Sequence, residues 1–419
     1  MNIRGIIMQY FSFIGTGGPN GYDEINYYFD NDPSLNQIKS QFIQEAIIKK
    51  HADIEHIFIF ATETAREKYG NFLLERLSPY NKPLDFIAIS ENDTFEVYVS
   101  KLLKSMKESE KVIIDITHSF RSIPTKLLFA LRYIELTKNV QIQHLYYGRK
   151  VGDTGEIVDL IQDYALQKIS ELLSQFDRTL MINSADVDNL FAEKDERIER
   201  FISSLANFNK MIEQCEFDRT TTVIRQIIES CNGIIKRPES YSLIMPVVTS
   251  IKNKFAIYNN CYNNVSRKIE LVKVIMAHNR KQVAITFIDQ LFREELIRNT
   301  LMPNDKNFSL ETYISKNLFG RHEQLDAYNL SQYLILNTYR IRTVFGSTDN
   351  DKYSGILYDK EKNIQAIKDI ITRNKMSDSI KRFYGDIRNH INHGQSITGD
   401  VDTIMHDMVG YIELLGKRE

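Results

Sequence analysis

The first 165 residues alternate short apolar runs with amphipathic segments of helical length, and this alternation constrains the fold more than any other feature of the chain. The apolar runs, interpreted as strands, are Ile6 to Ile14, Ile54 to Ala61, Leu84 to Ile89, Val112 to Ile116 and Gln141 to Tyr147. The helical patterns between them are Leu35 to Lys50, Thr64 to Leu77, Thr94 to Met106 and Pro124 to Lys138. This order predicts parallel strands joined by right-handed crossovers, a Rossmann-like sheet whose ligands bind beyond the carboxyl ends of the strands.

From about residue 166 onward the hydrophobic pattern becomes wholly helical. The predicted helices are Asp195 to Phe217, Thr220 to Asn232, Val247 to Tyr262, Ser266 to Asn279, Gln282 to Asn299, Leu325 to Val344, Asn363 to Arg373, Ser377 to His393 and Asp400 to Leu415. We therefore predict an α/β domain over residues 1–175 and an all-α region over residues 176–419.

The composition is that of a soluble protein without a general attraction to nucleic acid. The formal net charge is -2, so any contact with RNA must be local. The three cysteines, Cys215, Cys231 and Cys261, contain no CxxC pair, which argues against a zinc cluster and a disulfide framework and favours a reducing cytoplasm. No stretch offers about 18 uninterrupted apolar residues, so we expect no membrane span.

A glycine-rich turn, Gly15-Thr16-Gly17-Gly18, follows the first predicted strand. Glycines let a backbone approach a ligand closely and aim its N–H groups at an anion. The turn lacks the full GxGxxG spacing, and no helix follows at once, so a tight turn without a ligand is the alternative interpretation.

A polar decapeptide, Asp115-Ile-Thr117-His118-Ser119-Phe120-Arg121-Ser122-Ile-Pro124, follows the fourth predicted strand. Hydroxyl groups of Thr117 and Ser119 suit phosphate or ribose oxygens, His118 or Phe120 could stack on a base, and Arg121 adds a charged fork. The alternatives are that Asp115 caps the loop and that Phe120 belongs to the core. The density of polar groups between a strand and a helix favours a ligand site.

This decapeptide resembles the Asp-x-Thr-His-Gly-x-Arg-x-x-Pro motif of CRISPR-associated CARF proteins, and the Gly15-Thr16-Gly17 turn fits the first-strand loop of that family. The resemblance implies a pocket for a cyclic oligoadenylate activator, tetra- or hexa-adenylate, with Gly15, Thr16, Gly17, Thr117, His118, Ser119, Phe120 and Arg121 as ligand-binding residues. Ser119 departs from the usual glycine, so the ring size is left open.

The segment near the C-terminus combines an apolar stripe with polar groups. Ile380, Phe383, Tyr384, Ile387 and Ile391 recur at helical spacing and predict a docked helix. At about 100° per residue, the polar side chains of Arg388, Asn389 and His393 are expected to point away from the core.

An arginine, a polar amide and a histidine are the groups needed for metal-independent RNA cleavage, because imidazole moves protons near neutral pH and guanidinium binds the phosphate. The ribose 2′-OH supplies the nucleophile. Arg388 and His393 are nevertheless spread over about 140° of arc on one helix. This separation indicates two copies of the helix that face each other across a two-fold axis.

The pattern Arg388-Asn389-x-x-x-His393 resembles the R-x4-6-H signature of HEPN ribonucleases. The resemblance implies a homodimeric, single-stranded RNA endoribonuclease without a cofactor, in which Arg388 binds the phosphate, His393 transfers a proton or orients the 2′-OH, and Asn389 positions one of them. Together the two resemblances imply a CARF–HEPN ribonuclease that cyclic oligoadenylate activates in type III CRISPR defence.

Several alternatives remain open in the sequence. Asp386, His390 and His393 share a helix face and could begin a metal site. His393 could be a solvated residue at a helix end. Arg293 and Arg298 are interpreted as part of a solvated face balanced by nearby acids. The protein could also be a non-catalytic ligand-responsive regulator or a toxin-like HEPN ribonuclease without second-messenger control, and the sensor could degrade its own activator.

Overall fold

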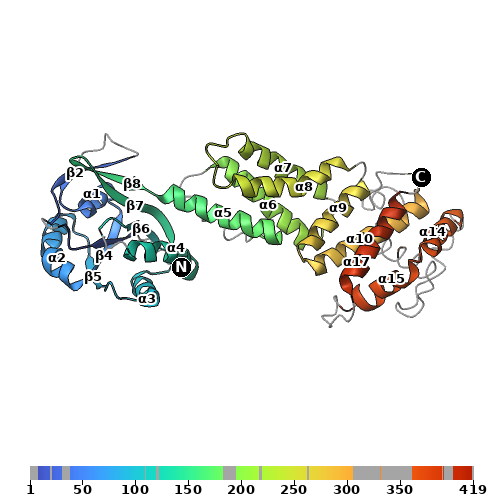
Figure 1. Ribbon diagram of the computed structural model, residues 1–419, viewed down its shortest axis with the longest axis horizontal. Coiled ribbons are helices and arrows are strands. Elements are labelled where there is room, and N and C mark those ends of the chain that lie inside the picture. Colours follow the sequence, from blue (N-terminus) through green and yellow to red (C-terminus); the bar gives the residue numbers. More distant parts are fainter. Residues whose placement is uncertain are drawn as a thin grey trace, which may run out of the picture. The chain divides into compact units, whose positions relative to one another are not determined.

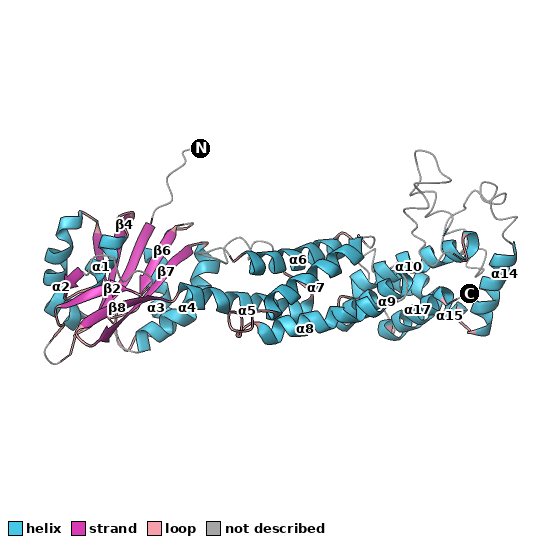
Figure 2. Ribbon diagram, turned by 90° about the horizontal axis from the view of Figure 1, so that it is seen from above, coloured by secondary structure: helices cyan, strands magenta, loops and turns pink. Residues whose placement is uncertain are grey.

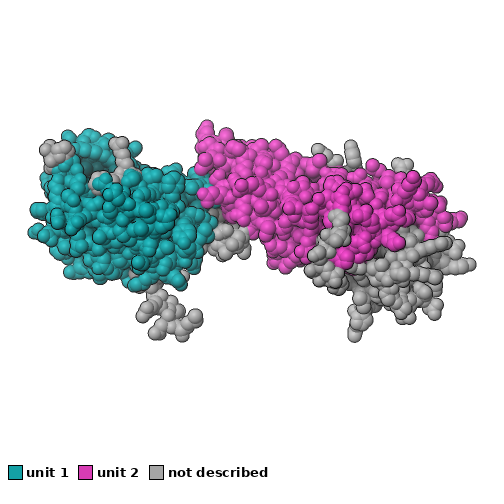
Figure 3. Space-filling view, turned by 60° about the horizontal axis from the view of Figure 1, so that its bottom comes forward, with its two compact units in different colours: residues 1–169, 188–194 teal, residues 170–187, 195–419 magenta. Residues whose placement is uncertain are grey.

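The computed structural model describes residues 8–18, 21–30, 38–108, 110–118, 122–182, 195–216, 219–261, 264–304, 331, 361–388, 390 and 400–417 (Figure 1). The chain divides into two compact units, and the division falls after Ile169, within one helix (Figure 3). The first unit holds the sheet, and the described part of the second unit is helical (Figure 2).

The first unit is built on an eight-stranded sheet with the order β3-β2-β8-β7-β6-β1-β4-β5. The strands are β1 Met8–Ile14, β2 Ile25–Phe29, β3 Ile38–Ser40, β4 Ile54–Ala61, β5 Leu84–Ala88, β6 Lys111–Asp115, β7 Gln141–Val151 and β8 Thr154–Asp159. The five predicted strands form the parallel part, β7-β6-β1-β4-β5. The predicted strand–helix alternation is thus confirmed.

Three strands were not predicted, and they make the sheet mixed. β8 pairs antiparallel with β7, β3 pairs antiparallel with β2, and β2 joins β8 in parallel. The β7–β8 hairpin turns at Gly152, whose φ of 60° suits glycine. The helix predicted over Leu35 to Lys50 is wrong at Ile38–Ser40, which pairs with β2, and right at Ile43–Lys50; residues 35–37 lie outside the described part of the chain.

Helices cover both faces of the sheet. They are α1 Ile43–Lys50, α2 Glu63–Leu77, α3 Phe95–Ser105 and α4 Ser122–Lys138. α1 and α2 pack on the face that carries Tyr10 of β1, whereas α3 and α4 pack on the face that carries Phe11 and Phe13. β1 is buried along its whole length because each face of the strand meets one of these two cores.

The second unit is helical throughout the residues that the structure describes. Its helices are α6 Glu196–Glu213, α7 Thr220–Ile235, α8 Met245–Ala256, α9 Asn264–Ala277, α10 Lys281–Leu301, α14 Glu361–Arg373, α15 Ser377–Arg382 and α17 Val401–Gly416; α5, Ile161–Thr179, begins in the first unit. The helix predicted over Leu325 to Val344 lies outside the described residues except for Ser331. Among the described helices, none is both long and apolar enough to cross a membrane.

The long helix α10 buries polar side chains that the sequence analysis assigned to solvent. Arg293 is 5% exposed and Arg298 is 2% exposed. The Arg298 guanidinium pairs with Glu295 at 2.8 Å and donates to the Leu415 carbonyl oxygen at 3.0 Å. The interpretation of these arginines as part of a solvated face is wrong, because each charge is matched within the helix packing.

Candidate functional site

The carboxyl ends of β6 and β7 border a small pocket of about 190 Å³ in the first unit. The lining comes from the loops after β1, β3 and β6 and from strands β2, β7 and β8. The lining residues are Gly21, Tyr22, Asp23, Ile25, Tyr27, Gln41, Thr117, His118, Gly148, Arg149, Lys150 and Gly155. Thr117 and His118 of the predicted ligand loop therefore line a pocket at the expected edge of the sheet.

Buried Asp115 organises the loop after β6. Its carboxylate accepts hydrogen bonds from Ser12 Oγ at 2.6 Å, Tyr10 Oη at 3.2 Å and the Thr117 backbone N–H at 3.0 Å. Burial raises the pKa of the Asp115 carboxyl above its ordinary value, and these hydrogen bonds oppose the rise. Asp115 thus caps the loop, as the alternative interpretation proposed.

The Thr117 hydroxyl is engaged inside the protein. It donates to Asp115 Oδ1 and accepts from the Gly148 backbone N–H at 2.7 Å. A Cβ on Gly148 would lie 2.4 Å from Ile43 Cδ1 and 3.0 Å from Thr117 Cγ2, so a larger residue would displace both side chains where β7 passes α1 and the loop. Thr117 therefore forms a rigid wall of the pocket, with its polar group directed at the protein.

His118 presents an imidazole at the same pocket. Its Nε2 is buried and has no hydrogen-bond partner among the described residues. Burial lowers the pKa of His118 to about 4, so the ring is neutral at pH 7. The ring packs against Tyr22 with centroids 4.5 Å apart. A buried imidazole nitrogen without a partner is costly, and a bound ligand would satisfy it.

Tyr22 occupies the glycine-rich turn after β1. Its hydroxyl accepts the Gly15 backbone N–H at 3.0 Å and is also near the Gly17 backbone N–H, while burial raises the pKa of Tyr22 to about 12. Gly17 and Gly21 have φ values of 68° and 85°. A Cβ at Gly21 would lie 2.7 Å from Tyr69 Oη. The turn thus requires glycine at positions 17 and 21, and the backbone N–H groups of Gly15 and Gly17, predicted to bind an anion, face the Tyr22 hydroxyl.

Other members of the predicted set play smaller roles or lie outside the described residues. The Thr16 carbonyl accepts a hydrogen bond from Lys68 Nζ at 3.0 Å. Ser119, Phe120 and Arg121 lie outside the described residues.

Two cations on the pocket rim were missed, because the β7–β8 hairpin was not predicted. Lys150 pairs with Asp23 at 2.6 Å, and Arg149 pairs with Glu156. Both side chains are more than half exposed, so they could exchange their carboxylate partners for a phosphate.

In the second unit, the segment Phe383–Arg388 is a π-helix that continues α15. Phe383, Tyr384 and Ile387 are buried, which confirms that part of the predicted apolar stripe. A π-helix places more residues in each turn than an α-helix, so the 100° spacing assumed in the sequence analysis does not hold here. Such turns occur frequently at functional sites.

The prediction that Arg388 points away from the core is wrong. Its side chain is 19% exposed, and its Nε lies 3.4 Å from Oδ2 of buried Asp289 on α10. The extra residue of the π-helical turn changes the direction of Arg388, and the Asp289 carboxylate attracts it. Asn389 and His393 lie outside the described residues.

Among the described residues, no cluster of metal-ligating side chains supports the alternative of a metal site. Asp386 is exposed and His390 is partly buried, while His393 lies outside the described residues. No three His, Cys, Asp or Glu side chains among the described residues lie where they could hold a metal ion together.

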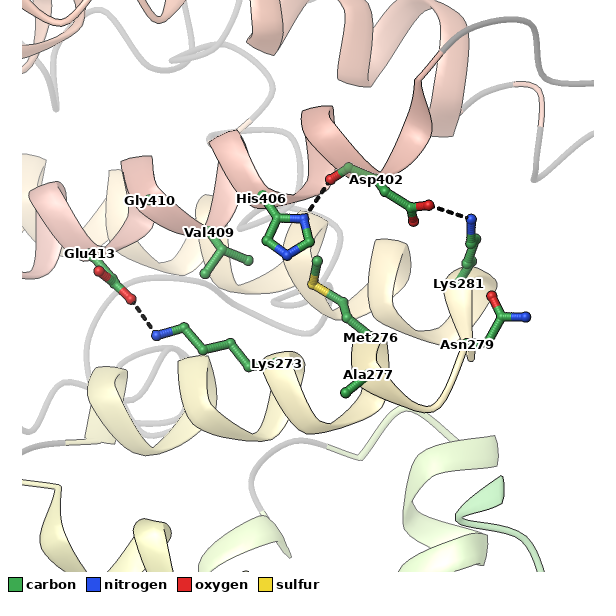
Figure 4. Close-up of a pocket in the computed structure, with 10 residues that line it drawn as sticks. All are labelled: Lys273, Met276, Ala277, Asn279, Lys281, Asp402, His406, Val409, Gly410 and Glu413. Atoms are coloured by element: carbon green, nitrogen blue, oxygen red, sulfur yellow. Dashed lines mark hydrogen bonds and ion pairs between the residues drawn. The ribbon is translucent and has the colours of Figure 1, made fainter. Parts of the chain in front are cut away.

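A larger pocket of about 630 Å³ lies between α9 and α17 in the second unit (Figure 4). Met276, Ala277 and Val409 contribute apolar surface. The Lys273–Glu413 ion pair at 2.8 Å joins α9 to α17, and the Lys281–Asp402 ion pair at 2.7 Å joins α10 to α17. His406 Nδ1 bonds the Asp402 carbonyl oxygen at 2.7 Å. Each of these lysines is paired with a carboxylate, so the ion pairs lend the pocket no excess charge.

Fold and geometry together define a two-unit protein that joins a mixed α/β sheet with a strand-end pocket to a helical unit. No family model matches the chain. Over 122 residues the chain is 30% identical to a CRISPR-associated protein of Methanocaldococcus jannaschii, a match that covers 28% of this chain and 18% of that relative. The chain therefore spans about a fifth of the relative's length. This similarity supports a CRISPR-associated protein.

Proposed function

We propose that the protein is a CARF–HEPN endoribonuclease that cyclic oligoadenylate activates in type III CRISPR defence. The observation that carries the proposal is the pocket at the strand ends, where Thr117 and His118 of the CARF-like motif meet Tyr22. The buried Nε2 of His118, which has no hydrogen-bond partner among the described residues, supports the proposal that this pocket takes a ligand. The similarity to a CRISPR-associated protein is consistent with such a ligand.

In the proposed sensor, the neutral His118 ring hydrogen-bonds or stacks on an adenine, and Arg149 and Lys150 approach the phosphates. Both rim cations are paired with carboxylates, so they would contact the phosphates of a ligand only after exchanging Glu156 and Asp23 for them. The amides of Gly15 and Gly17 become available to a phosphate only if Tyr22 moves. Ligand binding is thereby coupled to a local rearrangement of the turn.

In the proposed nuclease, the ribose 2′-OH attacks the adjacent phosphate and the 5′-oxygen leaves, which produces a 2′,3′-cyclic phosphate. Arg388 stabilises the charge that builds on the phosphate, and His393 moves a proton to or from the reacting oxygens. Asn389 positions one of these groups. The reaction needs no metal ion.

The proposed homodimer is supported by an apolar stripe on α4, the helix that follows the ligand loop. Phe129, Tyr133 and Leu136 are 75%, 53% and 63% exposed. Their spacing of four and three residues places them on one helix face. An exposed stripe of this kind favours a protein partner, and a second copy would bring two ligand loops together.

The test is an RNA cleavage assay with a panel of cyclic oligoadenylates. The proposal expects cleavage of single-stranded RNA, not DNA, in the presence of one ring, with no loss of activity in EDTA. Binding of a ring without cleavage would instead favour a non-catalytic regulator. The ion pair of Arg388 with Asp289 inside the helical unit is the observation that supports this alternative. Cleavage that no ring affects would favour a toxin-like ribonuclease.

A further inference from the structure

Asp289 lies between two arginines in the helical unit. Its Oδ1 accepts from Arg293 Nε at 2.7 Å, and its Oδ2 lies 3.4 Å from Arg388 Nε. The side chains of Asp289 and Arg388 are 11% and 19% exposed. One buried carboxylate is thus shared by a residue of the same helix and by the arginine of the π-helical turn.

Neighbouring groups fix Asp289 in this position. Arg293 donates to Ser331 Oγ at 3.0 Å, and its guanidinium lies 5.3 Å from the centre of the Tyr384 ring. Tyr384 belongs to the π-helical turn and packs against Phe292 of α10 with ring centroids 6.2 Å apart. The aspartate, its arginine partner and the turn that carries Arg388 therefore form one packed cluster.

α10 itself has little freedom to rotate. Glu294 pairs with Lys268 of α9 at 2.6 Å, and Arg298 donates to the Leu415 carbonyl oxygen of α17 at 3.0 Å. Glu294 and Arg298 are both buried, so rotation of α10 would disturb charged groups that are already matched within the packing. Asp289 is consequently presented to Arg388 from a rigid element.

We propose that Asp289 is a positioning residue that fixes the orientation of the Arg388 guanidinium, and that Arg293 holds Asp289 for this purpose. The inference rests on the proposed role of Arg388 in RNA cleavage. Arginine has a long and flexible side chain, and a contact at Nε, the guanidinium nitrogen nearest the chain, sets the direction of the whole fork. The same carboxylate also repels the phosphate of a substrate, which limits the affinity for RNA.

These two effects oppose each other in kinetics. Asp289→Asn removes the charge-assisted contact, so Arg388 becomes less well oriented and kcat should fall by about 10- to 100-fold, as expected for a misplacement near 1 Å. Loss of the negative charge should leave KM for RNA unchanged or lower it. A residue that only supports the fold would not split kcat from KM in this way.

A matched control is Glu294→Gln, which removes a buried carboxylate of the same helix whose ion pair is with Lys268 of α9. It should lower thermal stability without changing kcat of the folded protein. Arg293→Lys is a milder test, since it keeps the charge but loses the Nε donor to Asp289. It should lower kcat in the same direction as Asp289→Asn, and by less.

Modification by phenylglyoxal, mapped by peptide mass spectrometry on the full chain, tests the orientation without any nuclease assay. Arg388 should react faster in Asp289→Asn or Arg293→Lys than in the wild type, and Glu294→Gln should leave its rate unchanged. Equal rates in all four proteins, or equal kcat in Asp289→Asn and Glu294→Gln, would overturn the inference. If the wild type cleaves no RNA with any ring, the proposed function fails, and the modification rates still decide whether Asp289 orients Arg388.

Discussion

Two buried aspartates, one in each unit, organise the two candidate sites in different ways. Asp115 accepts hydrogen bonds from uncharged donors, including the backbone N–H of Thr117, and so fixes a stretch of main chain. Asp289 meets two guanidinium groups and fixes a side chain. The comparison teaches that the pocket depends on loop geometry, whereas the proposed cleavage site depends on the direction of one charged group.

The largest expected effect is a loss of RNA cleavage without a loss of ligand binding, which would show that the cleavage site and the sheet pocket act separately. Arg388→Ala and His393→Ala should each lower RNA cleavage by about 100-fold or more, because each removes a group that acts on the phosphate or its protons. Calorimetry should show that both variants bind cyclic oligoadenylate as the wild type does. Loss of ligand binding in either variant would mean that the two sites are not separate.

The next effect concerns the loop. Asp115→Asn places an amide NH₂ or a weaker acceptor among hydroxyl and N–H donors, so the free energy of unfolding in urea should fall by about 1–3 kcal/mol. Ligand affinity should fall as well, since Thr117 loses its anchor. Asp85→Asn, at an exposed carboxylate that pairs with His56, is the control and should change neither quantity measurably. An Asp115→Asn protein as stable as that control would contradict the role assigned to Asp115.

A smaller effect tests the occupancy of the glycine-rich turn. Tyr22→Phe keeps the ring against His118 but removes the hydroxyl that accepts the Gly15 N–H. The released amides should strengthen binding of a phosphate-bearing ligand by roughly 1 kcal/mol, about fivefold, as for one net hydrogen bond. Tyr69→Phe leaves Tyr22 in place and serves as the control. Weaker binding by Tyr22→Phe alone would show that the hydroxyl itself contacts the ligand.

The last effect is on the pH dependence of stability. The pKa of His118 is about 4 in the folded protein and about 6.5 when unfolded, so the unfolded chain binds more protons between these values. His118 therefore contributes stability that is present above pH 6.5 and is lost as the pH falls toward 4. We expect the free energy of unfolding in urea to fall less steeply from pH 7 to pH 4 in His118→Gln than in the wild type. The two slopes should differ by up to about 1 kcal/mol per pH unit. An unchanged slope would mean that the imidazole is not shielded from water.

Much of the first unit could be predicted from the sequence, because its five parallel strands contain apolar runs, of which β1, β4 and β6 are buried over most of their length. The strands β2, β3 and β8 escaped prediction for two reasons. β3 has only three residues, and the polar end of β7 gains its strand structure from pairing with β8. With that hairpin missed, Arg149 and Lys150 could not be assigned to the pocket.

The second unit was harder to predict where charge and irregular geometry decide the structure. A period of 3.6 residues found the helices but could not reveal the π-helical turn at Phe383–Arg388, so the direction of Arg388 was wrong. The side chains of Arg293 and Asp289 were predicted to face solvent because charged residues usually do. Their burial follows from mutual pairing, which only the three-dimensional packing shows.

The most direct test of the account mixes the full-length protein with cyclic tetra-adenylate or cyclic hexa-adenylate and a fluorogenic single-stranded RNA. The account predicts that one ring switches on cleavage, that EDTA leaves the rate unchanged, and that His393→Ala remains inactive while it still binds that ring. RNA cleavage at the same rate with and without either ring, or no cleavage while a ring is bound, would contradict the claim that the sheet pocket controls a nuclease in the helical unit.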